Sequence, residues 1–314
     1  MGLDPTLKRL LAKAYLNGFG NIHRFSAEQM RRYLSHPKLK GQKASYKDFK
    51  TSQDLSLRCY TPHTFDQQEV LPVVIYLSAS AFVIDRLDAS NDYCSLLANT
   101  LNMKVINVSH RLAPEHKFPR FLIDCMESIQ WIFQNATQCA IDPAKIALWG
   151  ESSGGSIAAT CTHLLRDEGH SPIQHLTLFY PMVDLVSPFP SKDEFSFGFM
   201  LDSAFIEWLD SIGFEPTQDR ADPLVSPLLS ANFKNLPKAT IITAEFDPLR
   251  DEGEAYVQKC IDAGVEVKHQ RFEGMIHGFM RFYSKVETAK TALHFACDAL
   301  KEHFISQSLS TVRE

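Results

Sequence analysis

A serine between closely spaced glycines, placed where a strand-like run gives way to a helical pattern, limits the fold of this chain more than any other feature. Residues 150–154, Gly-Glu-Ser-Ser-Gly, fit the frame G-x-S-x-G around Ser152. The apolar run 146–149 is typical of a buried strand, and the apolar spacing over 156–166 predicts a helix packed on a sheet. A serine on such a sharp turn is strained and exposes its hydroxyl. The glycines remove Cβ atoms where strand and helix crowd each other. The sequence therefore predicts a nucleophilic serine at Ser152.

A nucleophilic serine needs a base, and the base needs an orienting acid, each on a loop after a later strand. The apolar segment 239–243 predicts a strand that leads to Asp247, directly before a proline. The alternating segment 265–272 predicts another strand, and it leads to His277 in a glycine-rich loop. The order Ser152, Asp247, His277 therefore fits a catalytic triad.

Other assignments of the acid and the base stay open at this point. Asp247 could instead be a helix cap, because Asp before proline is a common helix entry. Asp251 and Glu252 compete as the acid, although both are expected inside the following helix. A lone histidine such as His269 or His303 is more often a solvated surface residue than a base. The joint order of three candidates favours the triad.

These segments resemble the hormone-sensitive-lipase-like family of α/β-hydrolases. The family's elbow G-D-S-A-G-G is matched by residues 150–155, its acid segment D-P-L-R-D-E-G by 247–253, and its histidine segment by 274–279. Its segment Y-R-L-A-P-E-H appears as His-Arg-Leu-Ala-Pro-Glu-His at 110–116. The matches extend from about residue 46 to residue 304. The resemblance implies a carboxylesterase or lipase with Ser152, Asp247 and His277 as its triad and with no metal or organic cofactor.

One segment departs from the family pattern. Where the family has H-G-G-G-F, residues 78–82 have the sequence Ser-Ala-Ser-Ala-Phe. By position, the oxyanion would be met by the backbone N–H groups of Ser80, Ala81 and Ser153. Without glycine the geometry of these donors is in question, and losing one well-aimed donor costs about 10²–10³ in rate. A hydroxyl of Ser78 or Ser80 donating directly is an alternative.

The predicted elements form one α/β unit with a mostly parallel, eight-stranded sheet flanked by helices. Residues 1–45 are predicted to form two helices, the second near 26–35, and residues 46–314 the catalytic domain. The family resemblance implies that these N-terminal helices and an aromatic-rich insertion at about 187–219 form a helical cap. Phe82 and a few aromatic residues of the insertion are expected to line an apolar, substrate-binding pocket. Strands are expected at 46–51, 55–60, 71–77, 104–109, 145–149, 175–179, 239–243 and 265–272.

Composition excludes several classes of function. The 314 residues are 45% hydrophobic and 22% charged, with a net charge of −5, so a large core is expected and no basic patch for nucleic acid. The seven cysteines include no C-x-x-C and indicate a reducing, cytoplasmic location. No apolar run reaches the roughly 18 residues of a membrane span, so no stable membrane insertion is expected. Dimers are frequent in the resembled family, so the resemblance implies a homodimer as one candidate oligomeric state.

The sequence therefore predicts a serine hydrolase that cleaves carboxylic esters of small to medium acyl chains through an acyl-enzyme. The alternative is a catalytically weak or inactive ligand-binding member of the fold, because the oxyanion segment is replaced. Amide or peptide hydrolysis is a third option, since the same triad serves acyl transfer generally. Glu151, beside the nucleophile, is expected to be structural.

Overall fold

A central sheet of eight strands organises the computed structural model, which describes residues 2–33, 43–169 and 171–311. The spatial order is β1-β2-β4-β3-β5-β6-β7-β8. β1 and β2 pair antiparallel, β2 joins β4 antiparallel, and every later pairing is parallel. The strands are β1 (Ser45–Lys50), β2 (Ser56–Thr61), β3 (Leu71–Leu77), β4 (Lys104–Val108), β5 (Ile141–Glu151), β6 (Ile173–Phe179), β7 (Lys238–Phe246) and β8 (Val267–Ile276). The predicted mostly parallel, eight-stranded sheet is confirmed.

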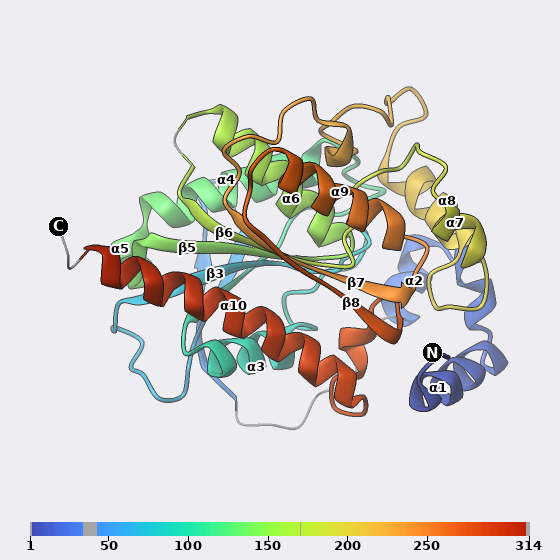
Figure 1. Cartoon of the computed structure of the whole chain (residues 1–314), viewed down its shortest axis with the longest axis horizontal. Helices are drawn as coiled ribbons and strands as arrows, with labels where there is room; N and C mark the ends of the chain where they lie inside the picture. The colour runs from blue at the N-terminus through green and yellow to red at the C-terminus, as the bar shows by residue number, and fades with distance from the viewer. Residues whose placement is uncertain (1, 34–42, 170, 312–314) are drawn as a thin grey trace.

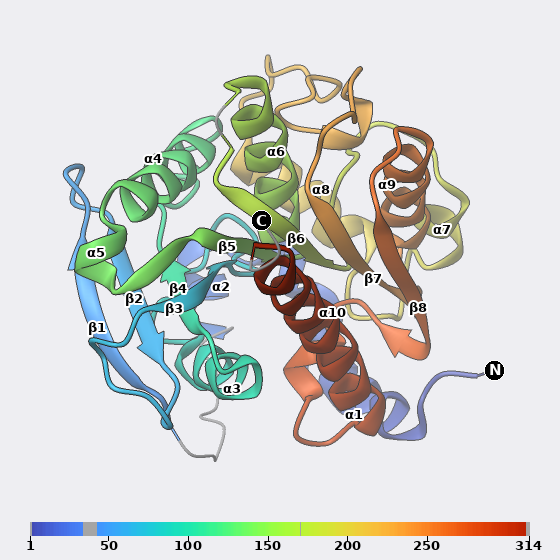
Figure 2. The same ribbon diagram turned by 60° about the vertical axis from the view of Figure 1, so that its left-hand side comes forward.

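Helices cover both faces of this sheet, as Figures 1 and 2 show. One face carries α3 (Asn91–Leu101) and α10 (Glu287–Thr311), and the other carries α4 (Arg120–Gln134), α6 (Ser153–Asp167) and α9 (Arg250–Asp262). A short helix α5 (Ala136–Cys139) follows α4, and 3₁₀ turns lie at Pro227–Leu229 (η2) and Phe279–Phe282 (η3). Parallel strands need such crossover helices, and the central strands are accordingly buried along nearly their whole length.

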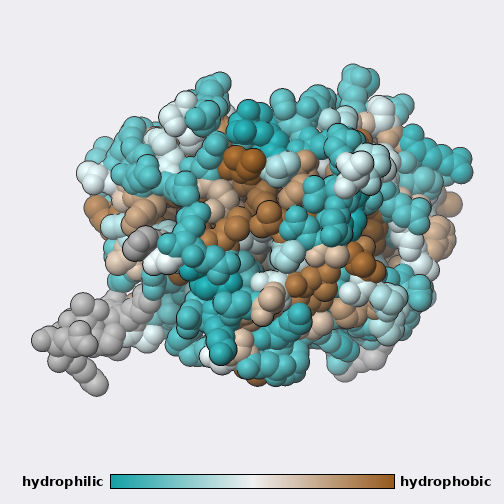
Figure 3. All heavy atoms as spheres, turned by 90° about the horizontal axis from the view of Figure 1, so that it is seen from above, coloured by the Kyte–Doolittle hydropathy of each residue, from teal (hydrophilic) through white to brown (hydrophobic). Residues whose placement is uncertain are grey.

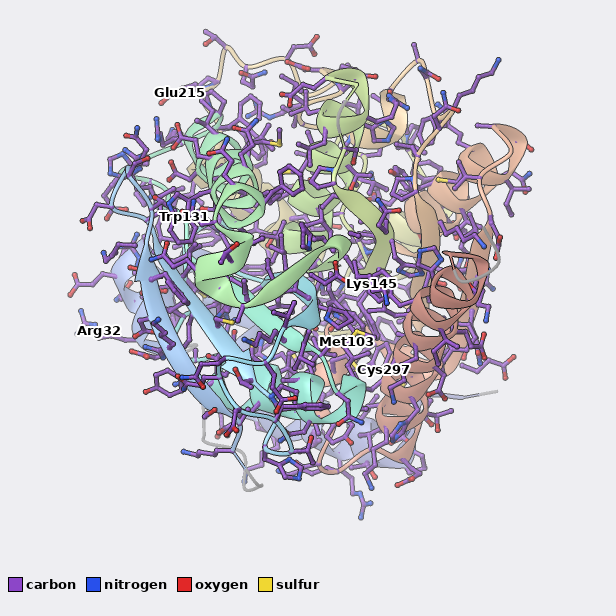
Figure 4. The ribbon with its side chains drawn as sticks, turned by 90° about the vertical axis from the view of Figure 1, so that its left-hand side faces the viewer. Arg32, Met103, Trp131, Lys145, Glu215 and Cys297 are labelled. Atoms are coloured by element: carbon purple, nitrogen blue, oxygen red, sulfur yellow. The ribbon has the colours of Figure 1, made fainter. Side chains whose placement is uncertain are left out.

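The apolar core is split by the sheet into two regions. Met103 and Cys297, labelled in Figure 4, belong to the region between the sheet and the pair α3 and α10. On the opposite face Trp131 of α4 packs on Phe49 of β1, with 6.0 Å between the ring centroids. Figure 3 shows one face of the molecule from above, on which hydrophobic side chains gather near the middle of the view and mostly hydrophilic ones surround them. Both faces of the sheet are therefore shielded from solvent.

The segments predicted to form a cap lie together at the end of the sheet to which the parallel strands point (Figure 1). They comprise α1 (Pro5–Leu16), η1 (Phe19–Arg24) and α2 (Ala27–Tyr33) from the N-terminus, and α7 (Pro190–Glu194) and α8 (Ser203–Gly213) from the insertion. The indole N–H of Trp208 donates to the Phe25 carbonyl at 3.1 Å. The rings of Tyr15 and Phe197 meet edge to face, 5.5 Å apart. The two parts of the predicted cap thus contact each other.

Element boundaries differ from the sequence expectation in a few places. The helix expected from residue 156 begins at Ser153, because the turn at Ser152 leads straight into helical backbone. β5 begins at Ile141, five residues before the apolar run 146–149, and β8 extends to Ile276. The second N-terminal helix, expected at 26–35, begins at Ala27 and ends at Tyr33, and residues 34 and 35 of that range lie outside the described residues.

The described residues contain no helix that is both long and apolar enough to cross a membrane. All seven cysteines are buried and free. Burial raises the pKa of several of these thiols, Cys139 to about 11 and Cys59 to about 12. They therefore act as small apolar core residues rather than as reactive thiolates.

Candidate active site

Ser152 occupies the sharp turn between β5 and α6. Its backbone angles, φ 54° and ψ −120°, lie outside the regions that residues with a Cβ normally adopt. Its N–H donates to the Phe179 carbonyl at 3.0 Å, and its carbonyl accepts from the Ser156 N–H at 3.1 Å. Strained backbone of this kind costs about 1–3 kcal/mol and persists only where neighbouring structure holds it. The strand and the helix hold Ser152 in this conformation.

Two glycines make the turn sterically possible. A Cβ on Gly150 would lie 2.5 Å from the Gly154 carbonyl oxygen and 2.7 Å from the Ala158 Cβ. A Cβ on Gly154 would lie 2.1 Å from the carbonyl oxygen of Leu77, at the end of β3. The close approach of strand and helix that the G-x-S-x-G frame predicts is therefore present.

The structure brings Ser152, His277 and Asp247 into one hydrogen-bonded chain. The Ser152 Oγ and the His277 Nε2 are 2.8 Å apart. The His277 Nδ1 is 2.8 Å from the Asp247 Oδ2, while the Asp247 Oδ1 accepts the Leu249 N–H at 2.8 Å. Asp247 is fully buried, and His277 is 8% exposed. This is the geometry by which a base can take a serine proton while an acid fixes the imidazole tautomer.

The two alternative acids, Asp251 and Glu252, are bound to other groups. Asp251 accepts the Ser191 N–H and pairs with Arg250. Glu252 accepts the Val183 N–H at 2.7 Å and lies 3.1 Å from the Lys192 ammonium. Both lie inside the first turn of α9, as expected. Neither makes a hydrogen bond to His277 among the described contacts.

Tyr180, which sequence analysis did not select, packs against the base. Its ring meets the His277 imidazole edge to face, 5.0 Å between centroids, and its hydroxyl donates to the Glu151 Oε2 at 3.0 Å. Burial raises the pKa of Glu151. Its hydrogen bond to Tyr180 agrees with the structural role expected for Glu151. Only the position of Tyr180 directly after β6 could have indicated a place near the site.

The loop after β3 contains no glycine in residues 78–82, yet two of its residues adopt a backbone conformation that glycine favours. Ala81 and Phe82 have φ values of 52° and 60°, in the left-handed region that glycine favours. The Ser80 N–H donates to the Ser78 carbonyl at 2.7 Å. The Ala81 N–H donates to the side-chain Oγ of Ser153 at 2.9 Å. Both N–H groups expected at the oxyanion thus have acceptors within the protein.

The hydroxyl of Ser80 also makes hydrogen bonds within the protein. The His110 Nδ1 lies 2.9 Å from the Arg111 carbonyl, which can only accept, so this nitrogen carries the ring proton. Burial lowers the pKa of His110 and keeps the ring neutral, so Nε2 accepts from the Ser80 hydroxyl at 3.1 Å. The same oxygen accepts the Phe82 N–H at 3.1 Å. The family pattern has tyrosine at the position of His110, which is the one signal for this contact in the sequence.

A small apolar cavity lies beside the first turns of α6. Phe82, 1% exposed, stacks on Phe121 with 4.5 Å between ring centroids and meets Phe214 edge to face at 5.6 Å. The cavity has a volume of about 10 Å³ and is lined by these rings and by Phe118, Leu122, Ser156, Ile157, Thr160, Leu224 and Val225. Phe82 thus lines an apolar cavity, together with residues from the end of the insertion.

The aromatic insertion mostly packs inward. Phe195 and Phe199 pack on Phe246 of β7, Phe199 stacked at 5.4 Å. Phe205 and Trp208 stack on each other at 5.5 Å, whereas Phe197 is 68% exposed. In the parts of the chain that the structure describes, no cluster of three or more His, Cys, Asp or Glu side chains is arranged to hold a metal ion.

Comparison with known proteins places this site in a family. Residues 74–281 match the family described as "alpha/beta hydrolase fold". The chain belongs to this family. The resemblance to the hormone-sensitive-lipase-like carboxylesterases that the motifs indicated is thereby confirmed.

Relatives of this α/β-hydrolase carry names of esterases. It is 30% identical over 293 residues to an arylesterase from Saccharolobus solfataricus, covering 89% of this chain and 93% of the relative. It is 32% identical over 250 residues to an ethyl acetate hydrolase from Pseudomonas putida, covering 79% of each. Among solved structures, a hyperthermophilic esterase from Pyrobaculum calidifontis superposes with a TM-score of 0.87 at 30% identity, covering 96% of this chain and 99% of that one.

Proposed function

We propose that this α/β-hydrolase cleaves carboxylic esters through an acyl-enzyme on Ser152. His277 takes the Ser152 proton as the hydroxyl oxygen attacks the ester carbonyl, and Asp247 stabilises the resulting imidazolium. The tetrahedral intermediate collapses as His277 protonates the departing alcohol. Water, deprotonated by His277, then attacks the acyl-enzyme and releases the acid and free Ser152.

The observation that carries the proposal is the continuous hydrogen-bonded chain from Ser152 through His277 to Asp247, at 2.8 Å for each contact. The three side chains come from turns after β5, β7 and β8, at the carboxyl edge of a parallel sheet, where ligands of such sheets bind. Ester hydrolysis as the reaction class follows from the family and its named esterases.

For the substrate, we propose esters of small to medium acyl chains, with the cavity around Phe82, Phe121 and Phe214 receiving the acyl group. Its volume of about 10 Å³ has room for roughly one water molecule, so the rings have to move apart for an acyl chain to enter. Its wall includes Ser156, whose N–H donates to the Ser152 carbonyl, so the cavity begins one helical turn from the nucleophile. Apolar walls favour an acyl chain over a charged group.

A second candidate is a ligand-binding protein with little or no turnover. It is favoured by one observation, namely that the N–H groups of Ser80 and Ala81 are engaged within the protein. An intermediate without enough donors forms slowly, because each donor contributes about 10²–10³ in rate. The complete triad favours the enzyme.

The test is hydrolysis of p-nitrophenyl esters from acetate to laurate by the wild-type protein and by Ser152→Ala in parallel. We expect turnover in the wild type that falls with chain length and is lost in the variant. A folded wild-type protein without Ser152-dependent turnover would support the binding protein instead. Comparing an ester with its matched anilide distinguishes an esterase from an amidase.

A further inference from the structure

The hydroxyl of Ser153 lies between the oxyanion loop and the nucleophile turn. Its Oγ accepts the Ala81 N–H at 2.9 Å, and its side chain is buried, 1% exposed. Within residues 2–33, 43–169 and 171–311, no acceptor takes the proton of this hydroxyl. The family elbow G-D-S-A-G-G has alanine at this position, so the hydroxyl is a property of this chain. A buried hydroxyl proton without an acceptor is costly unless something else accepts it.

We propose that the Ser153 hydroxyl donates a hydrogen bond to the ester carbonyl oxygen as that oxygen becomes an oxyanion. The Ala81 N–H then acts one step away, by polarising the hydroxyl that it donates to. The inference rests on the proposed esterase function and assigns Ser153 a catalytic role through its side chain.

Ser153 carries two hydrogen-bond donors, its backbone N–H and its hydroxyl. Ser153 is the first residue of α6, where the backbone N–H has no partner inside the helix and the helix dipole favours negative charge. The N–H and the hydroxyl belong to the same residue, so one oxygen atom can contact both. The backbone N–H is the donor already expected from the sequence. The hydroxyl adds a second donor from the same residue.

The other expected donors explain why the hydroxyl matters. The Ser80 N–H is bonded to the Ser78 carbonyl, and the Arg86 Nε donates to the Ala79 carbonyl at 3.2 Å, which fixes the Ala79–Ser80 peptide from its other end. The Ala81 N–H donates to the Ser153 hydroxyl rather than to the substrate. It therefore acts on the substrate only through the hydroxyl that it polarises. A hydroxyl that accepts one hydrogen bond donates a stronger one, and bonds to an oxyanion are stronger than neutral ones.

The opposite role is blockage, in which the Ser153 hydroxyl occupies the Ala81 N–H and keeps it from the substrate. The two roles predict rate changes of opposite sign when the hydroxyl is removed. Ser153→Ala leaves the backbone N–H in place and frees the Ala81 N–H. If Ser153 donates, kcat falls. If it blocks, kcat stays the same or rises.

The experiment measures kcat and KM for p-nitrophenyl acetate in the wild type and in Ser153→Ala. The matched control is Ser128→Ala, the same change at a buried serine of α4. We expect kcat to fall about 10- to 100-fold in Ser153→Ala, with KM changed far less, and to stay near the wild-type value in the control. Binding of a trifluoromethyl ketone, which forms an oxyanion adduct with a nucleophilic serine, should weaken in parallel with kcat/KM.

A second pair of variants guards against effects of folding. Ser153→Thr and Ser153→Val have nearly the same shape and differ in the hydroxyl, so their ratio of kcat values reports the donor alone. We expect the threonine variant to be the faster by at least about tenfold. Equal rates in this pair, or an unchanged or raised kcat in Ser153→Ala, would overturn the role of Ser153 while leaving the esterase intact. Absence of Ser152-dependent turnover in the wild type would overturn both.

Discussion

The ring of Tyr180 packs edge to face on the imidazole of His277, with 5.0 Å between the ring centroids. The hydroxyl of the same tyrosine donates to Glu151, the residue directly before Ser152. Tyr180 therefore links the base to the strand that carries the nucleophile. Because the contact to His277 is made by the ring and the contact to Glu151 by the hydroxyl, the two can be separated by substitution.

Replacing Tyr180 by phenylalanine should lower stability and leave turnover largely intact. The buried Glu151 loses a donor, which costs about 1–3 kcal/mol of unfolding free energy, while the ring on His277 remains. Denaturant unfolding and ester kinetics measure the two effects. Tyr180→Leu removes the ring contact as well, and its kcat should fall below that of the phenylalanine variant. Equal kcat values in the two variants would show that the ring does not position His277.

Replacing Asp247 by asparagine should lower kcat by about 10³–10⁴-fold. The amide can donate to the His277 Nδ1 and so favours the wrong imidazole tautomer, while the geometry stays intact. The control is Asp251→Asn, which alters a neighbouring carboxylate whose partners are Ser191 and Arg250. A loss of kcat in the control as large as that in Asp247→Asn would contradict the assignment of the acid.

Much of this arrangement follows from local sequence signals. The apolar run before Gly150 and the alternation before His277 mark strands because buried strands and half-buried strands have distinct patterns. Asp247 precedes a proline, which ends the strand and opens the path to α9. These signals are local, and the structure places all three triad candidates where they indicated.

The remaining contacts depend on side chains that meet across the fold. The Ser80 hydroxyl reaches His110 thirty residues away, and the Ala81 N–H reaches Ser153 across the gap between β3 and α6. No pattern of hydrophobicity encodes which way a peptide N–H points. The positive φ of Ala81 likewise could not be foreseen, because alanine carries no preference for it. The cytoplasmic location and the homodimer stay predictions.

Enlarging the aromatic cavity should shift the acyl preference. Phe214 is 3% exposed and contacts Phe82, so Phe214→Leu removes part of the cavity wall. We expect the ratio of kcat/KM for octanoate to that for acetate to rise about tenfold, because each methylene placed in an apolar pocket contributes roughly 1 kcal/mol or more. The control is Phe133→Leu, on the exposed side of α4. An unchanged ratio in Phe214→Leu would place the acyl chain elsewhere.

Stability should fall as the pH drops from 7 to 5. Burial lowers the pKa of His175 to about 3 and that of His163 to about 4. Both pKa values lie below the unfolded value of about 6.5, so the unfolded chain binds more protons in this window and acid favours unfolding. Burial raises the pKa of Glu252 to about 7, and this shift opposes the effect of the two histidines.

The measurement is the unfolding free energy in urea at pH 7 and pH 5. Without His175, the decrease in unfolding free energy between pH 7 and pH 5 should be smaller by about 2 kcal/mol. The unfolding free energy of His175→Asn should therefore depend less steeply on pH than that of the wild type. The control is His63→Asn, at an exposed histidine, which should keep the wild-type slope. Parallel slopes for His175→Asn and the wild type would mean that His175 does not contribute.

The central claim is that Ser152 carries the acyl group during turnover. Its most direct test is to mix the protein with p-nitrophenyl acetate, quench within the first turnover, and locate the acetyl group by peptide mass spectrometry. We predict a burst of p-nitrophenol and one acetyl group on Ser152, with no burst in His277→Ala. An acetyl group on any other residue, or steady turnover in Ser152→Ala at the wild-type rate, would contradict the account.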